Sequence, residues 1–224
     1  MSHKRILPLV MQPTNTNDWI CTASCVSMVF QTESFQGLDL PIDQHEIARP
    51  MLCTNPTFPQ ERYCGNIEAL RTLKSFGIDV SFVAVSNPVA ALQICQKNGI
   101  EAILSLRYSS KTAAHAVLIS YMDDRYAYVN DPLDYANSAN PEKTNQNKRI
   151  LKTNLRTFMA SLKHDKNIIM SNTLYLIAPP QKCEMKIFPC PGCGANIHLF
   201  KALYNLTSGV LCENCGWVTV NHHQ

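Results

Sequence analysis

The sequence has no apolar run long enough to cross a membrane as a helix. Such a span needs about 18 or more consecutive apolar residues, and no stretch of the 224-residue chain approaches that length. At the N-terminus, the apolar run that follows Lys4 and Arg5 is broken by Pro8 and is too short for the apolar part of a secretory signal. We therefore expect no membrane insertion and a cytoplasmic location where the protein is made, and any export would use a route without a cleaved leader.

A strongly basic surface is also missing from the sequence. The net charge is +3, charged residues make up 17% of the chain, and Lys and Arg are scattered along it. Nucleic-acid-binding surfaces cluster their basic residues and often interleave them with aromatic side chains, so we predict no nucleic-acid partner. Hydrophobic residues make up 46%, a proportion typical of a chain with a packed core. Nothing in the sequence indicates the oligomeric state.

Cysteine, in contrast, is abundant, with ten residues. Without a secretory signal, this number indicates metal binding or catalysis more than a disulfide framework. Four cysteines form two CxxC pairs, Cys190 with Cys193 and Cys212 with Cys215, with eighteen residues between the pairs. Four thiolates at this spacing suit tetrahedral Zn²⁺ in a closed, structural site, and a pair of redox-active CxxC motifs is the alternative. We therefore predict a small C-terminal zinc ribbon.

Two changes in composition divide the rest of the chain. The segment from Pro132 to Arg149 is polar and rich in Pro and Asn, which predicts a long surface loop. Residues 179–188 are predicted to be a linker before the cysteine-rich tail. The predicted organisation is therefore a main domain at 1–178, the linker, and the zinc ribbon at 189–224.

Helical patterns come early in the main domain, and strand patterns dominate its later part. The hydrophobic periodicity and the Pro, Gly and Asn residues that end each pattern place the elements. The predicted fold class is α+β, with helices packed on an antiparallel sheet. We expect helices at 21–31, 66–76, 88–99 and 153–162, and strands at 78–85, 100–106, 114–121, 126–130 and 173–177.

Cys21 and Cys25 lie four residues apart in the first predicted helix. The N-terminus of a helix lowers the pKa of a thiol through its free N–H groups and its dipole. Cys21 lies at this end, where Asn17 or Asp18 can cap the helix, whereas Cys25 lies one turn later on the packing side. Cys21 is therefore the candidate nucleophile, and Cys25 is predicted to pack in the core.

A catalytic thiol needs a base, and the base needs an acceptor that orients it. His115 begins one predicted strand and Asp131 follows the next, so a hairpin between the two strands brings imidazole and carboxylate together. Asn130 is the neighbouring acceptor, but it points to the opposite face. Gln12, in the loop before Cys21, is the candidate donor to an oxyanion.

The order of these residues resembles the papain-like cysteine peptidases. The similar segments are LPLVMQPTNTNDWICTASCVSMVF at 7–30 and HAVLISYMDDRYAYVNDP at 115–132, and the likeness extends over about Leu7 to Ile177. Within this family the chain looks most like the bacterial peptidases related to bacteriocin-leader processing and to secreted effectors. The resemblance implies a nucleophile at Cys21, a general base and acid at His115, an orienting carboxylate at Asp131 and an oxyanion donor at Gln12.

The resemblance also implies a protein or peptide substrate and an acyl-enzyme intermediate. A deamidase or a transglutaminase would use the same residues, and a catalytically inactive domain that binds proteins together with its ribbon is the alternative from another class. The chain departs from the family at Thr22, where Gly or Trp is usual, and in the longer segment between Gln12 and Cys21. A zinc ribbon is not a standard part of the family's fold.

Overall fold

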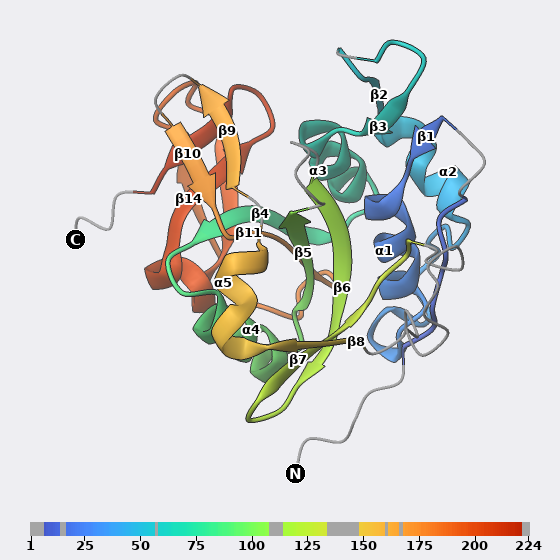
Figure 1. The fold of residues 1–224 in the computed structure, drawn as a ribbon. Coiled ribbons are helices and arrows are strands. Elements are labelled where there is room, and N and C mark those ends of the chain that lie inside the picture. The colour runs from blue at the N-terminus through green and yellow to red at the C-terminus, as the bar shows by residue number, and fades with distance from the viewer. Residues whose placement is uncertain are drawn as a thin grey trace.

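The structure is a computed structural model that describes residues 7–13, 17–56, 58–107, 114–133, 148–159, 161–165 and 168–220. These residues form a mixed α/β fold around an eight-stranded antiparallel sheet with the order β15-β14-β4-β11-β5-β6-β7-β8 (Figure 1). A large antiparallel sheet with helices packed on it confirms the predicted class at this level. Its strands are β4 (Asp79–Val85), β5 (Glu101–Arg107), β6 (Ala114–Met122), β7 (Tyr126–Asn130), β8 (Lys148–Leu151), β11 (Thr173–Ala178), β14 (Thr207–Cys212) and β15 (Gly216–Thr219).

Five α-helices, four short 3₁₀ helices and three smaller sheets complete the described fold. The α-helices are α1 (Cys21–Phe30), α2 (Gln44–Ala48), α3 (Asn66–Ser75), α4 (Pro88–Asn98) and α5 (Leu155–Phe158). The smaller sheets are β1 (Asp18–Trp19), β3 (Arg62–Cys64) and β2 (Leu52–Thr54) in that order, β9 (Ser161–Asp165) with β10 (Ile168–Ser171), and β12 (Met185–Pro189) with β13 (Asn196–Phe200). None of the helices in the described ranges is long and apolar enough to cross a membrane.

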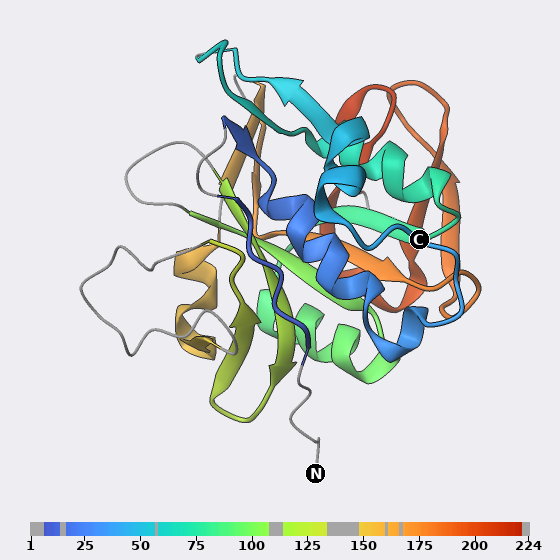
Figure 2. The same ribbon diagram turned by 90° about the vertical axis from the view of Figure 1, so that its right-hand side faces the viewer.

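Two hydrophobic cores lie on opposite faces of the main sheet. Phe82 and Leu118 belong to the core that contains α1, α2 and α3, whereas their chain neighbours Val83 and Val117 belong to the core that contains α4 and α5. This division follows from the alternation of side chains along a strand. Figure 2 shows the face that α1 and α3 cover. Because both faces are covered, the strands are apolar on both sides.

The ends of α4 follow the sequence prediction. The Asn87 side chain accepts a hydrogen bond from the Ala90 N–H at 3.1 Å, and Pro88 occupies the first turn, where its missing N–H costs nothing. The helix ends at Asn98, and the residue that caps it, Gly99, has a φ of +66°. That left-handed conformation is accessible to glycine without strain.

The start of α1 differs from the prediction that Asn17 or Asp18 caps it. The N-cap residue is Ile20, and no side chain caps the helix. Asp18 lies instead in β1, which pairs in parallel with β3, and its carboxylate accepts two hydrogen bonds from Arg62 at 2.6 and 2.8 Å. The Asp18 carboxylate is therefore engaged by Arg62 and does not cap α1.

The helix predicted at 153–162 is shorter than expected. It is a 3₁₀ turn followed by α5, which ends at Phe158 because Met159 takes an extended conformation and forms a β-bridge with Leu106. The segment predicted as a surface loop at 132–149 lies mostly outside the described residues, and its last two residues belong to β8.

The C-terminal segment contributes two strands to the main sheet. β14 pairs with β4 and continues through a turn into β15, and β12 begins within the predicted linker at 179–188. The Trp217 ring lies 5.0 Å from that of Phe82, which stacks on Tyr175 at 3.9 Å. The division of the chain into units at 1–178 and 189–224 stays a prediction.

Replacing Phe82 should destabilise the fold strongly. Phe82 is fully buried between two aromatic rings, so Phe82→Ala should lower the free energy of unfolding by about 3–5 kcal/mol. Chemical denaturation measures the change. Ile187→Ala is the control, since Ile187 is 56% exposed and its loss should change the stability by no more than about 0.5 kcal/mol. Equal effects of both substitutions would contradict the described packing.

Candidate active site and metal centre

Cys21 is the first residue of α1, where the helix begins against β6. The Ala116 N–H of β6 donates a hydrogen bond to the Cys21 Sγ at 3.5 Å. Cys25, one turn later, donates from its own Sγ to the Ala116 carbonyl at 3.5 Å and is completely buried. Cys21 is only partly buried. The helix therefore leaves Cys21 partly accessible and packs Cys25 completely in the core.

The hairpin of β6 and β7 brings His115 and Asp131 together. The His115 Nε2 lies 2.6 Å from the Asp131 Oδ1, and the two side chains are 9% and 2% exposed. Asp131 also accepts the Leu133 N–H at 3.1 Å, and the Lys148 Nζ lies 3.5 Å from its second oxygen. Since Nε2 faces the carboxylate, the other ring nitrogen is left for the hydrogen bond between His115 and Cys21.

The surroundings of Cys21 and His115 favour a thiolate and an imidazolium. Burial raises the pKa of Cys21, but the hydrogen bond and charge of His115 and the N–H groups of Ala116 and Thr22 outweigh it, so this pKa lies below its ordinary value of 9.0. Burial lowers the pKa of His115, but hydrogen bonds to Asp131 and Cys21 raise it to about 9. Each partner thus stabilises the charged form of the other.

The pKa values of Asp131 and Cys25 are also shifted, in directions consistent with a charged pair of Cys21 and His115. Burial raises the pKa of Asp131, but the hydrogen bond with His115 outweighs it and keeps the carboxyl ionised. Burial raises the pKa of Cys25 well above its ordinary value, and the nearby charges of Cys21 and Asp131 add to that effect. Cys25 is therefore a neutral thiol, unsuited to nucleophilic attack at neutral pH.

Gln12 is held beside the carboxylate end of the hairpin. The residue is 4% exposed, and its backbone N–H donates to the Pro132 carbonyl at 2.8 Å. The residue before it, Met11, accepts a hydrogen bond from Gln44 at 2.9 Å, and Gln44 in turn accepts one from Ser24 of α1. Hydrogen bonds thus connect the segment that contains Gln12 to Pro132, the residue after Asp131, and through Gln44 to helix α1, which begins at Cys21. An oxyanion role for Gln12 stays a prediction.

Asn130 does not face His115. It is fully buried, and its Nδ2 lies 3.4 and 3.3 Å from the carbonyl oxygens of Leu7 and Pro8. It therefore holds the N-terminal segment in place, on the opposite side from Asp131. The sequence reasoning missed Lys148 as a second partner of Asp131, because Lys148 lies beyond a long polar segment whose path no local pattern indicates.

The four cysteines of the CxxC pairs form a cluster. Their Sγ atoms all lie within 4.8 Å of one another, with Cys190 and Cys215 at 3.4 Å and Cys193 and Cys212 at 3.6 Å. Tetrahedral zinc with Zn–S bonds of about 2.3 Å holds its sulfurs about 3.8 Å apart. None of the four forms a disulfide. The cluster therefore has the number, type and spacing of ligands that a tetrahedral metal ion requires.

No family model matches the chain, and no curated protein does. Among the solved structures, the chain is similar to one described as a double glycine motif protease from an AMS/PCAT transporter in complex with the leader peptide. The identity is 14% and the TM-score 0.47, with 80% of this chain and 96% of that chain covered.

Cys21 should be the fastest of the described main-domain cysteines to react with iodoacetamide at pH 7. Its lowered pKa leaves more thiolate than Cys25 has, so we expect labelling at least about tenfold faster. In His115→Ala, burial becomes the dominant influence and raises the pKa of Cys21, so this advantage should disappear. Peptide mapping by mass spectrometry measures both rates. Equal labelling of the two cysteines in the unsubstituted protein would contradict the geometry.

The purified protein should carry about one metal ion per chain, because four cysteine sulfurs within 4.8 Å of one another match a closed tetrahedral site. Cys215→Ser should lose most of the metal. Cys183→Ser is the matched control, since Cys183 lies outside the cluster with its Sγ 3.5 Å from the Asn98 carbonyl. Elemental analysis of both variants checks this. Full metal content in Cys215→Ser would contradict the assignment of ligands.

Proposed function

We propose that the protein is a papain-like cysteine peptidase that hydrolyses a peptide or isopeptide bond. The observation that carries the proposal is the hydrogen-bonded sequence from Cys21 to His115 to Asp131, with the pKa of the thiol lowered and that of the imidazole raised. Asp131 holds the ring and stabilises its positive charge, which is the role of the third member of such a triad. The domain at 1–178 is the proposed catalytic unit.

In the proposed reaction, the Cys21 thiolate attacks the carbonyl carbon of the substrate and forms a C–S bond. Charge then develops on the carbonyl oxygen, which the Cys21 N–H at the start of α1 and the Gln12 side chain would stabilise. One such donor is worth about 10²–10³-fold in rate. The N–H of Cys21 suits this role because the first N–H groups of a helix have no partner within it.

His115 moves the protons in both halves of the reaction. As an imidazolium it donates its proton to the leaving amine, so that the C–N bond breaks and a thioester to Cys21 remains. The neutral ring then takes a proton from water, which attacks the thioester and releases the acid. General acid–base help of this kind is typically worth about 10²–10⁴-fold. Attack by an amine in place of water, or a glutamine side chain as the substrate, would make the same site a transglutaminase or a deamidase.

For the cysteine cluster we propose a structural Zn²⁺ ion held by Cys190, Cys193, Cys212 and Cys215. The four soft ligands fill a tetrahedral coordination sphere and leave no position for a reacting water. Bound zinc would hold two chain turns together, and no step of the hydrolysis runs through it.

Cys21→Ser should abolish peptide cleavage, with a loss of about 10³-fold or more, because the hydroxyl is far less acidic than the thiol. The matched control is Cys25→Ser, one turn away and without a role in the reaction. Incubation with a proteome-derived peptide mixture and mass spectrometry of the products measures activity. New N-termini indicate hydrolysis, glutamate in place of glutamine indicates deamidation, and amine-linked glutamine indicates transfer. If Cys21→Ser retains all of the activity, the proposal fails.

The pH profile of kcat/KM should be bell-shaped. Activity should rise with pH as the thiol ionises below its ordinary pKa of 9.0, and fall as the imidazolium loses its proton near pH 9. Asp131→Asn removes the strongest influence that raises the pKa of His115, so the alkaline limb should move to lower pH. An alkaline limb that stays in place in this variant would remove Asp131 from the mechanism.

A further inference from the structure

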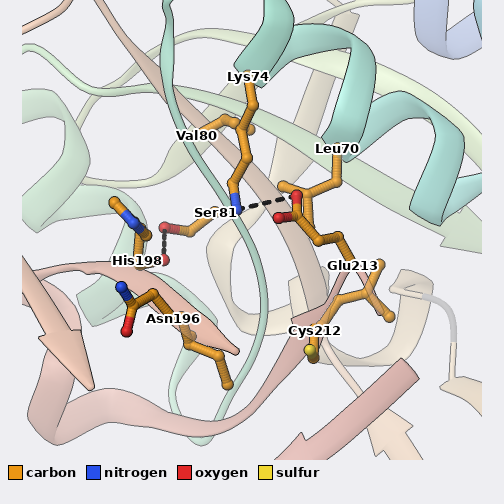
Figure 3. Close-up of a pocket in the computed structure, with 10 residues that line it drawn as sticks. Leu70, Lys74, Val80, Ser81, Asn196, His198, Cys212 and Glu213 are labelled. Atoms are coloured by element: carbon orange, nitrogen blue, oxygen red, sulfur yellow. Dashed lines mark hydrogen bonds and ion pairs between the residues drawn. The ribbon is translucent and has the colours of Figure 1, made fainter. Parts of the chain in front are cut away.

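The turn of the second CxxC pair contacts helix α3 directly through a hydrogen bond and an ion pair. Glu213 lies between Cys212 and Cys215, and its carbonyl accepts a hydrogen bond from Arg71 at 2.6 Å. Its carboxylate lies 3.0 Å from the Lys74 Nζ. Figure 3 shows Lys74 reaching from α3 to Glu213, with Cys212 beside it. Two side chains of one helix thus bind one residue of the metal-binding turn.

The other end of α3 is held through an aromatic stack that starts beside the same turn. Trp217 follows two residues after Cys215 and packs on Phe82, whose ring is stacked on Tyr175 with an interplanar angle of 7°. The Tyr175 hydroxyl donates to the Asn66 Oδ1 at 2.6 Å, and Asn66 is the first residue of α3. The metal-binding segment therefore contacts α3 near its C-terminus and, through this stack, at its N-terminus.

From α3 the contacts continue to the candidate nucleophile. Gly65 connects α3 to β3, which pairs in parallel with β1 and holds Asp18 through Arg62. The chain runs from Asp18 through Trp19 and Ile20 to Cys21. Every link from the cysteine cluster to the thiol is thus a covalent bond, a strand pairing, a ring contact or a hydrogen bond.

We propose that the metal at the four cysteines positions the nucleophile: it fixes the turn of Glu213, the turn holds α3, and α3 holds the β3–β1 pair that ends at Cys21. Metal binding and the reactivity of Cys21 are then thermodynamically coupled, and the coupling acts in both directions. The proposal rests on the proposed function in that Cys21 is the activated thiol. The sulfur-rich, closed centre selects a thiolate-binding divalent ion such as zinc.

The first test measures the rate at which iodoacetamide alkylates Cys21 at pH 6 in the full-length protein, with zinc and after its removal by a chelator. At this pH ordinary thiols are almost entirely protonated, so only an activated thiolate reacts quickly. We expect zinc removal to slow alkylation of Cys21 by roughly fivefold or more, within the usual range of coupling, and added zinc to restore the rate. Circular dichroism and the unfolding midpoint are recorded on the same samples.

The second test breaks the contact and leaves the ligands in place. Arg71→Ala combined with Lys74→Ala should keep about one zinc per chain and still slow the alkylation of Cys21 in the zinc-loaded protein, toward the rate of the zinc-free form. Lys201→Ala is the matched control, because it breaks the ion pair of Lys201 with Glu184 at 2.6 Å, which does not involve α3. The control should react at the rate of the unsubstituted protein.

The outcomes separate this proposal from the proposed function. If Cys21 shows no fast alkylation in any form, the assignment of the nucleophile fails. If Cys21 stays equally fast without zinc and in the zinc-loaded double variant, the nucleophile stands and the coupling is overturned. If zinc removal unfolds the whole chain, the zinc-loaded double variant provides the test. If its Cys21 is alkylated at the rate of the unsubstituted protein, the proposal is overturned.

Discussion

The contact between His115 and Asp131 depends on the register of one hairpin, and the candidate site depends on that contact. β6 and β7 pair with Leu118 opposite Asn130, so Asp131 follows on the same side of the sheet as His115. A shift of one residue would turn the carboxylate to the other face and bring Asn130 toward the imidazole. Asn130 instead binds the carbonyl groups of the N-terminal segment. Because side chains alternate along a strand, Asp131 contacts His115 on one face, while Asn130 binds the N-terminal segment on the other.

The N-terminal segment and helix α1 then complete the site from the other side. Asn130 and Pro132, on either side of Asp131, both bond to this segment, while Gln44 links it to α1. The carboxylate of Asp131, the proposed oxyanion donor Gln12 and the proposed nucleophile Cys21 therefore belong to one connected framework. Such preorganisation favours catalysis because the polar groups are already arranged around the reacting atoms before the substrate binds.

Much of this arrangement could be predicted from the sequence, because the signals are local. Helices α3 and α4 have clear hydrophobic periodicity, and recognisable residues mark their ends. In the hairpin of β6 and β7, the short turn brings His115, near the start of β6, close to Asp131, which follows β7. The contacts that could not be predicted join segments far apart in the chain. β1 and β3 have two and three residues and show no periodicity, so nothing indicated that Asp18 would bind Arg62 in place of capping α1. The pairing of β14 with β4 is likewise set by tertiary packing.

That last pairing also determines whether the edge of β4 is available for pairing with a second chain. β4 has an apolar surface on both sides, and its outer backbone edge is covered by β14. An uncovered strand of this kind offers a row of unpaired N–H and C=O groups to which a second chain can add. The cysteine-rich segment therefore covers the β4 edge of the sheet. A chain cut before β14 would expose this apolar strand to intermolecular β-pairing, while in the intact protein the sheet continues to the short strand β15.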